Sequence, residues 1–367
     1  MELSAFADVY GDFYAPVYAV RLGGQDLVRD VLVAVSQVEV ELKLRTASRF
    51  SFTIADAYDQ DGQFFRTGDG DDLMALLTFG ADVEVCMGYG DAKSTPRVVQ
   101  GIVTEITLNF PEGGSPEVAV SGFDHGHRLV DGKSSRTWKD RRDSEVAKEL
   151  ASFHNLGEAI ETTAEQHPQI EQNQEGDWDF LEKLAKRNHF QLYVDEGKQL
   201  HFHPPNDDVS AAIELAWGRG LLSFKPEANI ARQVSKVEVY GWDPRRKKAF
   251  VGKATAGEES GLTGRSAGQR LNGYVRHPDK RPTLRVRQPC FSQSEADARA
   301  KAAFNERAKE FLTGEGEVIG LPDVRPDRRI KLTELGSFSK TYYVNEVVHK
   351  IDANGYRTRF KVKEPGL

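Results

Sequence analysis

The sequence predicts a mainly β protein with an α+β insertion, in which two barrel-like antiparallel β domains flank a small helix-helix-hairpin module. Three observations lead to this fold class. Runs in which apolar and polar residues alternate fill both ends of the chain, helical periodicity is confined to a few short segments, and Gly- and Pro-rich turns separate the runs. A chain of 367 residues is also too long for one simple core.

Residues 1–130 form the first predicted β-barrel domain. Four runs alternate apolar with polar residues, which is typical of strands that bury one face. They are VEVELKL (38–44), RFSFTIAD (49–56), DVEVCM (82–87) and PEVAVSGF (116–123). Because short turns rather than helices connect these runs, we expect an antiparallel barrel or sandwich.

Residues 131–205 form the predicted α+β module. SEVAKELASFHNLG places apolar residues at helical spacing, and Gly157 can take the left-handed position after that helix. DWDFLEKLAKRN predicts a second helix with Asp177 as its N-cap. FQLYVDEGKQLHFHPP follows with two alternating runs around a Gly-containing turn, which predicts a β-hairpin.

Residues 206–367 form the second predicted β-barrel domain. Its strands are expected in VSKVEVYGW, RPTLRVRQP and KTYYVNEVVHKID. One helix is predicted over 294–312, where Ser294 and Asp297 have capping-box spacing. Residues 254–281 contain no periodic run, and we expect a long loop there, either one that orders on contact with a partner or a plain mobile loop.

Composition restricts the classes of partner. The net charge of −7 and pI near 5.8 argue against a dedicated nucleic-acid binder. The basic clusters DRRD, DPRRKK and DVRPDRR are interleaved with Asp, which indicates a solvated or salt-bridged surface. No apolar run approaches the roughly 20 residues that span a bilayer, and the start of the chain does not resemble a signal peptide. Cys86 and Cys290 are expected to be buried reduced thiols.

Two His-x-His pairs raise the possibility of a metal site. Asp124, His125 and His127 occur in DHGH, and His201 and His203 occur in LHFH, and these residue types are common ligands of zinc and iron. However, DHGH follows a strand and has the composition of a turn. In LHFH the strand period points both imidazoles away from the core. We therefore assign no metal ligands, and a histidine-ligated metalloenzyme remains an alternative.

Catalytic patterns are weak. Glu175 and Asp177 could form a glycosidase pair, but both lie at a helix start, where negative charge is favoured in any case. The chain has no GxSxG elbow, no Walker loop and no dinucleotide fingerprint. We therefore assign no catalytic and no cofactor-binding residues, expect no cofactor, and expect the protein not to be an enzyme. An all-β carbohydrate-binding or hydrolytic protein remains the other alternative.

QNQEGDWDFLEKLAKRNHFQLYVDEGKQLHF resembles the signature of the phage late control gene D family, which also occurs in the hub portion of type VI secretion valine-glycine repeat proteins. The matching residues are Gln172, Glu175, Asp177, Phe180, Leu181, Leu184 and Ala185. Gly176 and Lys183 stand where the family usually has Ser and Arg. VSGFDHGHRL and VSKVEVYGWDPRRKKAFVG resemble further family segments in the expected order, so the resemblance covers nearly the whole chain.

The resemblance implies a structural baseplate hub of a contractile phage tail or phage-derived injection system. In this family three copies form a ring whose two β domains per subunit mimic six-fold symmetry. The implied partners are two further copies, the hexameric tail tube protein, the trimeric spike and other baseplate proteins, with no specific nucleic acid and no membrane insertion. Because the sequence stops at KVKEPGL, we expect the spike to be a separate protein. The implied location is cytoplasmic during assembly and then the baseplate of the particle.

Overall fold

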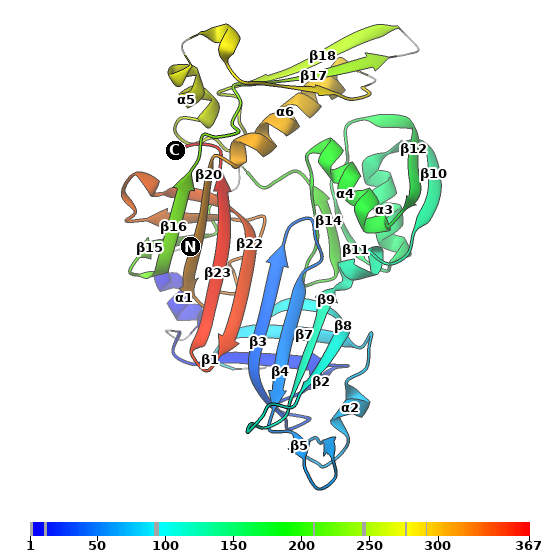
Figure 1. Cartoon of the computed structure of the whole chain (residues 1–367), viewed down its shortest axis with the longest axis vertical. Helices are drawn as coiled ribbons and strands as arrows, with labels where there is room; N and C mark the ends of the chain where they lie inside the picture. The colour runs from blue at the N-terminus through cyan, green and yellow to red at the C-terminus, as the bar shows by residue number, and fades with distance from the viewer. Residues whose placement is uncertain are drawn as a thin grey trace.

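The computed structural model describes the chain except for residues 1–2, 11–12, 92–94, 208–209, 244–246, 276 and 291. Figure 1 shows an elongated molecule in which two β barrels lie offset along the long axis. A small α+β module lies beside the place where the barrels meet, and a layer of helices and a separate sheet covers one end of the second barrel. In the described part of the chain, no helix is both long and apolar enough to cross a membrane. The mainly β fold class predicted from the sequence is confirmed.

The first barrel is open. Its strands, in hydrogen-bonded order, are β1 (Pro16–Leu22), β7 (Asp82–Tyr89), β8 (Arg97–Asn109), β9 (Glu117–Asp124), β4 (Arg49–Ala55) and β3 (Ala34–Lys43). The two end strands meet through the Tyr18 hydroxyl, which donates to the Val35 carbonyl at 2.5 Å, and share no ladder among the described residues. Buried Val, Phe and Ile residues alternate with polar ones along β3 and β4, as the period-two runs predicted.

Several short helices and strands are attached to the first barrel. They are α1 (Leu3–Tyr10), β2 (Gln25–Asp26), β5 (Tyr58–Asp59), β6 (Phe64–Phe65) and α2 (Leu73–Leu76). The segment with β5, β6 and α2 projects from the end of the first barrel that lies farthest from the second barrel (Figure 1). The Tyr10 hydroxyl of α1 donates to the Asp323 carboxylate at 2.6 Å, so α1 is tied to a residue near the second barrel.

The second barrel is closed. Its six strands are β15 (Ile213–Trp217), β16 (Gly220–Ala228), β20 (Leu312–Ile319), β23 (Gly355–Glu364), β22 (Lys340–Asp352) and β21 (Arg329–Thr333), and β21 pairs again with β15. Large rings fill its interior, where Phe360 is buried. Gly316 makes room for this ring, because a Cβ there would lie 2.4 Å from Cζ of Phe360. The short 3-10 turn Gly336–Phe338 joins β21 to β22.

The two barrels share one sheet. β3 of the first barrel pairs antiparallel with β22 of the second, with Leu42 opposite Val347 and Val40 opposite His349. A continuous sheet of 13 strands results, and one hydrophobic core runs through both barrels. The alternation of residues predicts that each run is a strand, but it does not specify this neighbour.

The module contains more strands than predicted. Its elements are β10 (Ser134–Arg142), α3 (Asp143–Phe153), β11 (Gly157–Ile160), β12 (Gln166–Glu175), α4 (Asp177–Asn188), β13 (Gln191–Val194) and β14 (Gln199–His203). The two helices and the β13–β14 hairpin are present as expected. β10 and β12, which pair as a ribbon, were missed because they are mostly polar and bury few apolar side chains, such as Trp138 and Ile170.

Both predicted helix ends in the module are wrong by a small margin. The left-handed residue after α3 is Asn155, with φ of 55°, whereas Gly157 begins β11. The N-cap of α4 is Gly176, and Asp177 is the first helical residue. Gly157 instead pairs with Gln199 at the start of β11, and the Asp177 carboxylate binds side chains of neighbouring elements.

The strands predicted for the second barrel divide between two sheets. β17 (Lys236–Asp243), β18 (Lys248–Thr255) and β19 (Thr283–Arg287) form a separate three-stranded sheet with a core of its own. The predicted helix is α6 (Gln293–Lys309), which packs on this sheet. Its N-cap is Ser292 rather than Ser294, because the Ser292 hydroxyl accepts from the Glu295 amide at 3.0 Å.

The expected long loop over 254–281 is wrong. This segment begins with the end of β18 and contains α5 (Ala267–Tyr274) and a 3-10 turn at Pro278–Lys280. Ser266 and Gln269 form a capping box, and Ala267 and Leu271 are buried, so this helix packs against the rest of the chain. The helix was missed because it is short and contains two glycines.

Candidate functional site

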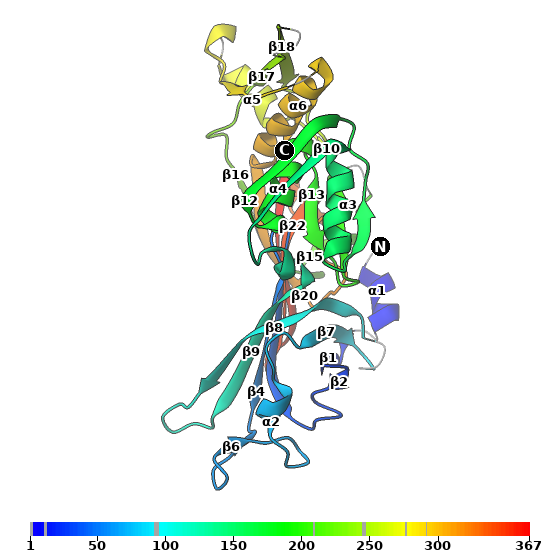
Figure 2. The ribbon, with the colours of Figure 1, turned by 90° about the vertical axis from the view of Figure 1, so that its right-hand side faces the viewer.

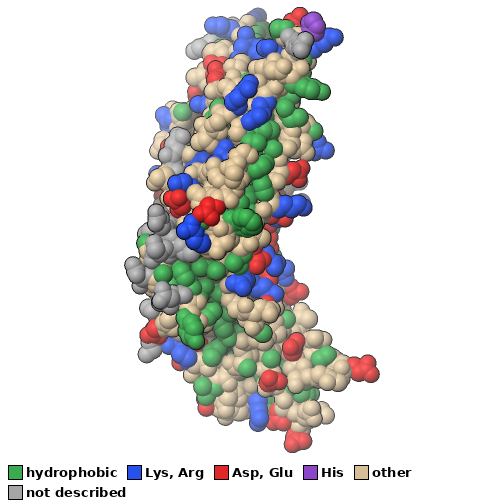
Figure 3. Space-filling view, turned by 90° about the vertical axis from the view of Figure 1, so that its left-hand side faces the viewer, with side chains coloured by type: hydrophobic (Ala, Val, Ile, Leu, Met, Phe, Trp, Pro, Cys, Tyr) green, Lys and Arg blue, Asp and Glu red, His purple; other side chains and the backbone are tan. Residues whose placement is uncertain are grey.

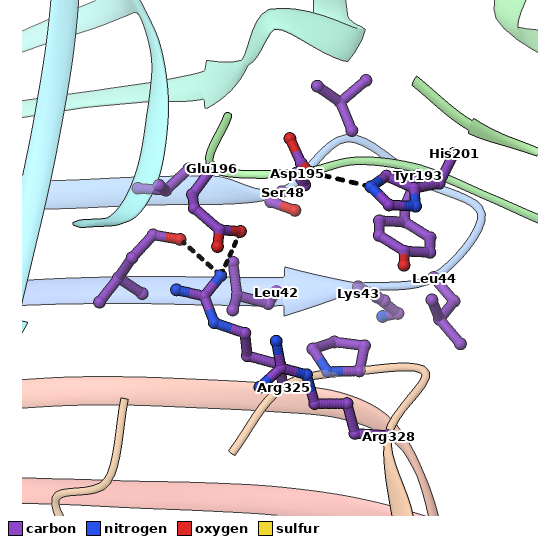
Figure 4. A pocket seen from close by; sticks show the side chains of 14 residues that line it. Leu42, Lys43, Leu44, Ser48, Tyr193, Asp195, Glu196, His201, Arg325 and Arg328 are labelled. Atoms are coloured by element: carbon purple, nitrogen blue, oxygen red, sulfur yellow. Dashed lines mark hydrogen bonds and ion pairs between the residues drawn. The ribbon is translucent and has the colours of Figure 1, made fainter. Parts of the chain in front are cut away.

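The barrels and the module meet around a cavity of about 120 Å³ (Figure 4). It is lined by the end of β3, the start of β8, the β13–β14 turn and the segment that leads into β21. Arg325 is the central polar side chain at this junction. Its guanidinium donates to the Glu196 carboxylate at 2.5 Å and to the Arg97 carbonyl at 2.8 Å. One side chain therefore connects the second barrel, the module and the first barrel.

Burial lowers the pKa of Arg325 from its ordinary value, and the nearby Glu196 carboxylate opposes this shift. A buried guanidinium requires such a partner, because an uncompensated charge in the interior is costly. The Glu196 side chain also reaches the junction from the hairpin turn, where Asp195 accepts hydrogen bonds from the Gly197 and Gln199 amides, both at 2.8 Å. The turn is therefore held in the position that places Glu196 beside Arg325.

His201 and His203 point away from the module core, as predicted, and both are half-buried at the junction. His201 Nε2 lies 2.9 Å from Asp195 Oδ2, and the imidazole stacks on Tyr193 with ring centroids 4.4 Å apart. His203 Nδ1 lies 2.7 Å from the Pro204 carbonyl. Hydrogen bonds from His201 and backbone amides hold the pKa of Asp195 below its usual range, although burial opposes them. These contacts give both imidazoles a packing role.

DHGH is a turn, as the sequence predicted. Asp124 ends β9 and caps a 3-10 helix, His125–Leu129, by accepting from the Gly126 amide at 2.8 Å. Its other oxygen accepts from the Ser48 amide at 2.6 Å. Burial raises the pKa of Asp124 to about 7, and burial lowers the pKa of His125 to about 4. His127 stacks on the Phe123 ring. Across the described ranges, no group of three or more His, Cys, Asp or Glu residues could hold a metal ion.

Glu175 and Asp177 make separate structural contacts. The Asp177 carboxylate accepts from Gln172 at 2.6 Å and from Arg136 at 2.9 Å, and it lies 2.8 Å from His154 Nε2. Glu175 instead forms an ion pair with Lys183. Neither carboxylate lines the junction cavity. The pair thus joins the ribbon to the helices and does not face a common substrate space.

A buried polar network, which sequence reasoning missed, connects the module with the second barrel. Asp327 accepts from the Tyr343 hydroxyl at 2.6 Å, and the same hydroxyl accepts from Gln191 of β13 at 2.9 Å. Burial raises the pKa of Asp327. The network continues with Arg329, which binds Glu364 at 3.0 Å. Asp327 and Arg329 expose 1% and 5% of their surface, so DVRPDRR is salt-bridged as predicted, and these two of its charges are buried while Arg328 is exposed.

The outer face of the joined sheet is a regular polar surface. The register of β20, β23, β22 and β3 places alternate residues of these strands side by side. We call this surface the joined sheet face, and its members are Glu315, Glu317, Ile319, Arg357, Arg359, Lys361, Glu346, Val348, Lys350, Glu39, Glu41 and Lys43. Five carboxylates and five cations stand in this set. The face therefore carries no net charge.

Several opposite charges on this face are paired. Lys361 Nζ lies 2.7 Å from Glu346, and Lys43 Nζ lies 3.4 Å from the same carboxylate. Arg359 Nε lies 2.9 Å from Glu317. Hydrogen bonding from Lys361 and the charges of Lys361 and Lys43 lower the pKa of Glu346, against the effect of its burial. Exposed pairs of this kind add little stability each, so the alternation matters chiefly for the field outside the sheet.

Solved structures of other proteins share the fold of this chain. The family model described as Alg8 N-terminal domain matches residues 16–353, and a search of curated proteins finds no match. The crystal structure of a 43 kDa tail protein of prophage MuSo2 from Shewanella oneidensis has a TM-score of 0.71 at 14% identity, covering 96% of this chain and 99% of that chain. The tail protein from Neisseria meningitidis MC58 gives 0.68 at 16% identity, covering 96% and 97%.

A component of the type VI secretion system of E. coli, described as structurally similar to two T4 bacteriophage tail proteins, gives a TM-score of 0.55 at 10% identity. It covers 94% of this chain and 76% of that chain. At these identities the likenesses show a shared fold: the chain has the architecture of phage tail proteins over almost its whole length.

Proposed function

We propose that this chain, which belongs to the Alg8 N-terminal domain family, is a structural hub of a contractile phage tail or phage-derived injection system. Its tail-protein fold supports this role. In this proposal three copies form a ring that joins the hexameric tail tube to the trimeric spike. The motifs that resemble the late control gene D family support the same role, and membership in that family is part of the proposal.

The observation that carries this proposal is the presence of two six-stranded barrels that share β3 and β22 as neighbours in one sheet. Three such subunits would present six barrels around an axis. A ring of this kind can meet a six-fold partner on one side and a three-fold partner on the other. The division into residues 1–130, 131–205 and 206–367 remains a proposal, with β17, β18, β19 and α6 as an inserted layer of the last unit.

We assign the joined sheet face to the wall of the central channel. Its equal numbers of carboxylates and cations would produce a weak field, since several of the charges lie next to opposite ones. A polymer or folded cargo that passes such a wall would meet neither a cationic track nor a continuous apolar surface. The candidate catalytic residue Asp177 and the candidate metal ligand His201 also support a structural role, because neighbouring side chains hold both of them.

The proposed partners are two further copies, a tail tube protein, a separate spike protein and other baseplate proteins. The proposed location is the cytoplasm during assembly and then the baseplate of the particle. Light scattering of the purified chain, alone and mixed with its spike, tests the proposal. We expect a trimer, or a monomer that becomes a trimer with spike. A monomer that does not respond to spike contradicts the hub, and stoichiometric zinc or iron in the same sample would point to the histidines instead.

A further inference from the structure

The β17–β18–β19 sheet has one face on α6 and the other in solvent. Val237 and Val239 point toward α6 and are buried, as is Gly241. The alternate residues of β17 therefore face outward. Two of them are aromatic, and Tyr240 and Trp242 expose 39% and 52% of their surface. Adjacent exposed aromatic side chains on a sheet are a frequent feature of binding surfaces.

Cations surround these two rings. The strand register places Tyr240 between Val251 of β18 and Arg287 of β19. The next outward residue, Glu238, has Arg285 as its neighbour on β19. We call this surface the basic aromatic face, and its members are Lys236, Glu238, Tyr240, Trp242, Val251, Lys253, Arg285 and Arg287. Four cations and a single carboxylate stand in this set.

The carboxylate does not offer a free negative charge. Glu238 accepts from the Tyr240 hydroxyl at 2.8 Å and lies 3.4 Å from Arg285 Nε, and it pairs with Lys236. Hydrogen bonds from Lys236 and Tyr240 lower the pKa of Glu238 to about 2. Since this charge is already neutralised within the face, Lys253 and Arg287 give the surface an excess of positive charge.

The opposite end of the molecule carries the complementary chemistry. Residues 56–72 contain six Asp and one Arg, and five of these Asp side chains are exposed. Next to them Phe110 exposes 58% of its surface and packs against Tyr58 and Phe65, with ring centroids 5.5 and 6.0 Å away. We call residues 56–72 together with Phe110 the acidic lobe. It presents an exposed ring beside carboxylates, as the basic aromatic face presents exposed rings beside cations.

We propose that the basic aromatic face of one copy binds the acidic lobe of the next copy, so that subunits associate head to tail; this inference rests on the proposed function as a ring-forming hub. The two surfaces lie at opposite ends of the long axis, which prevents them from meeting within one chain (Figure 1). Figure 3 shows the same polarity, with Lys and Arg prevailing at the end with α5 and Asp and Glu at the other end. A contact between different surfaces of identical subunits closes into a ring when the rotation per copy allows it.

Single-stranded nucleic acid is the alternative ligand for the basic aromatic face, because bases stack on aromatic side chains that cations flank. The net charge of −7 opposes this occupant, since the remainder of the molecule repels a polyanion. A second copy brings its negative charge in one localised lobe, together with an aromatic ring that can be buried against Tyr240 and Trp242. The observations therefore favour the second copy.

Charge reversal tests the contact. In a face variant, Lys253, Arg285 and Arg287 become Glu; in a lobe variant, Asp61, Asp69 and Asp71 become Lys; the combined variant carries both changes. We expect each single-surface variant to associate at least about tenfold more weakly by sedimentation, and the combined variant to recover the wild-type association. Trp242→Ala should also weaken it. A matched control reverses three exposed module cations, Lys133→Glu, Lys139→Glu and Lys148→Glu, and should leave the association unchanged.

The outcomes separate this inference from the proposed function. Recovery in the combined variant supports the head-to-tail contact, because misfolding could not be rescued by a second set of reversals. If the wild type forms trimers and both single-surface variants do so equally well, the inference is wrong while the hub stands. If the wild type forms no trimer with or without spike, the proposed function fails. The nucleic-acid alternative is tested with a labelled 20-nucleotide single-stranded DNA. If the wild type binds this DNA, and the face variant still forms trimers but no longer binds it, the basic aromatic face is a nucleic-acid site.

Discussion

Arg329 and Glu364 form a buried ion pair that links β21 to β23 of the second barrel, with Arg329 Nη2 3.0 Å from Glu364 Oε2. Their side chains expose 5% and 0% of their surface. Arg329 also donates to the carbonyls of Asp207 and Thr341, at 2.9 and 3.2 Å. The Asp207 carboxylate in turn accepts from Lys309 of α6 at 2.6 Å. Closure of the barrel and docking of the α6 layer therefore depend on the same buried charges.

Removing the Arg329 charge should destabilise the fold. In Arg329→Met the buried Glu364 carboxylate loses its paired cation, and breaking a buried pair on one side costs about 3–5 kcal/mol. Arg359→Met is the matched control, because its pair with Glu317 lies at the surface, where such pairs contribute about 0–1 kcal/mol. Urea unfolding of both variants measures the difference. Equal losses in the two variants would contradict the structural role of the buried pair.

His349 should make stability fall in acid. The imidazole is fully buried, and burial lowers its pKa to about 3, whereas an unfolded His titrates at about 6.5. Between these values the unfolded chain takes up a proton that the folded chain does not. The stability contributed by neutral His349 is thus present above about pH 6.5 and is lost as the pH falls toward 3, by up to about 1.4 kcal/mol per pH unit.

Unfolding midpoints of the wild type and His349→Gln, measured from pH 7 to pH 4, test this dependence. The difference in stability between the two proteins should shrink as the pH falls. His127→Gln serves as the control, because His127 is half-buried and stacks on the Phe123 ring instead of lying in the core. Parallel curves for the wild type and His349→Gln would show that another group causes the acid sensitivity.

Much of the secondary structure could be predicted from the sequence, because a strand with one buried face has period-two alternation. VEVELKL and RFSFTIAD lie in β3 and β4 for this reason. Sheet membership could not be predicted, since β17 alternates as clearly as β3 and yet belongs to a separate sheet. The pairing of β3 with β22 joins residues about 300 positions apart, and no local pattern specifies such a neighbour.

The buried charges at the junction could not be predicted from the sequence for a related reason. Arg325, Asp327 and Arg329 resemble a solvated surface when only their sequence neighbours are considered. Their burial depends on distant partners, namely Glu196 for Arg325 and Glu364 for Arg329. The turn role of Asp124 was predictable because its hydrogen bond to Gly126 is local.

Arg325 should control the mobility of the module. Arg325→Ala removes the donor that binds Glu196 of the hairpin turn and the Arg97 carbonyl of β8. We expect faster amide hydrogen exchange at the β13–β14 turn and at the start of β8, while exchange in β20 and β23 stays as in the wild type. Arg328→Ala is the control, because Arg328 lines the same cavity but its guanidinium donates to the Asp323 carbonyl at 3.4 Å. Unchanged exchange at the turn in Arg325→Ala would show that packing alone holds the module.

Gly252 should be required for docking of α6 on β18. A Cβ at this position would lie 1.9 Å from the Ala296 carbonyl oxygen, so Gly252→Ala must push the helix away from the sheet. Overpacking of this kind typically costs about 1–3 kcal/mol. Gly273→Ala in α5 is the matched control, because no atom lies within 4 Å of the added Cβ.

The rate at which each cysteine reacts with a thiol reagent measures whether α6 moves away from β18 in Gly252→Ala. Cys290 is fully buried in the core beneath α6, and Cys86 is 1% exposed in the first barrel. Burial raises the pKa of both thiols, so each should react slowly with a thiol reagent in the folded wild type. In Gly252→Ala the Cys290 thiol should react faster while the Cys86 thiol stays protected. Faster reaction of both thiols would mean that the barrels unfold together with the inserted layer, and protection of both would mean that α6 tolerates the added methyl group.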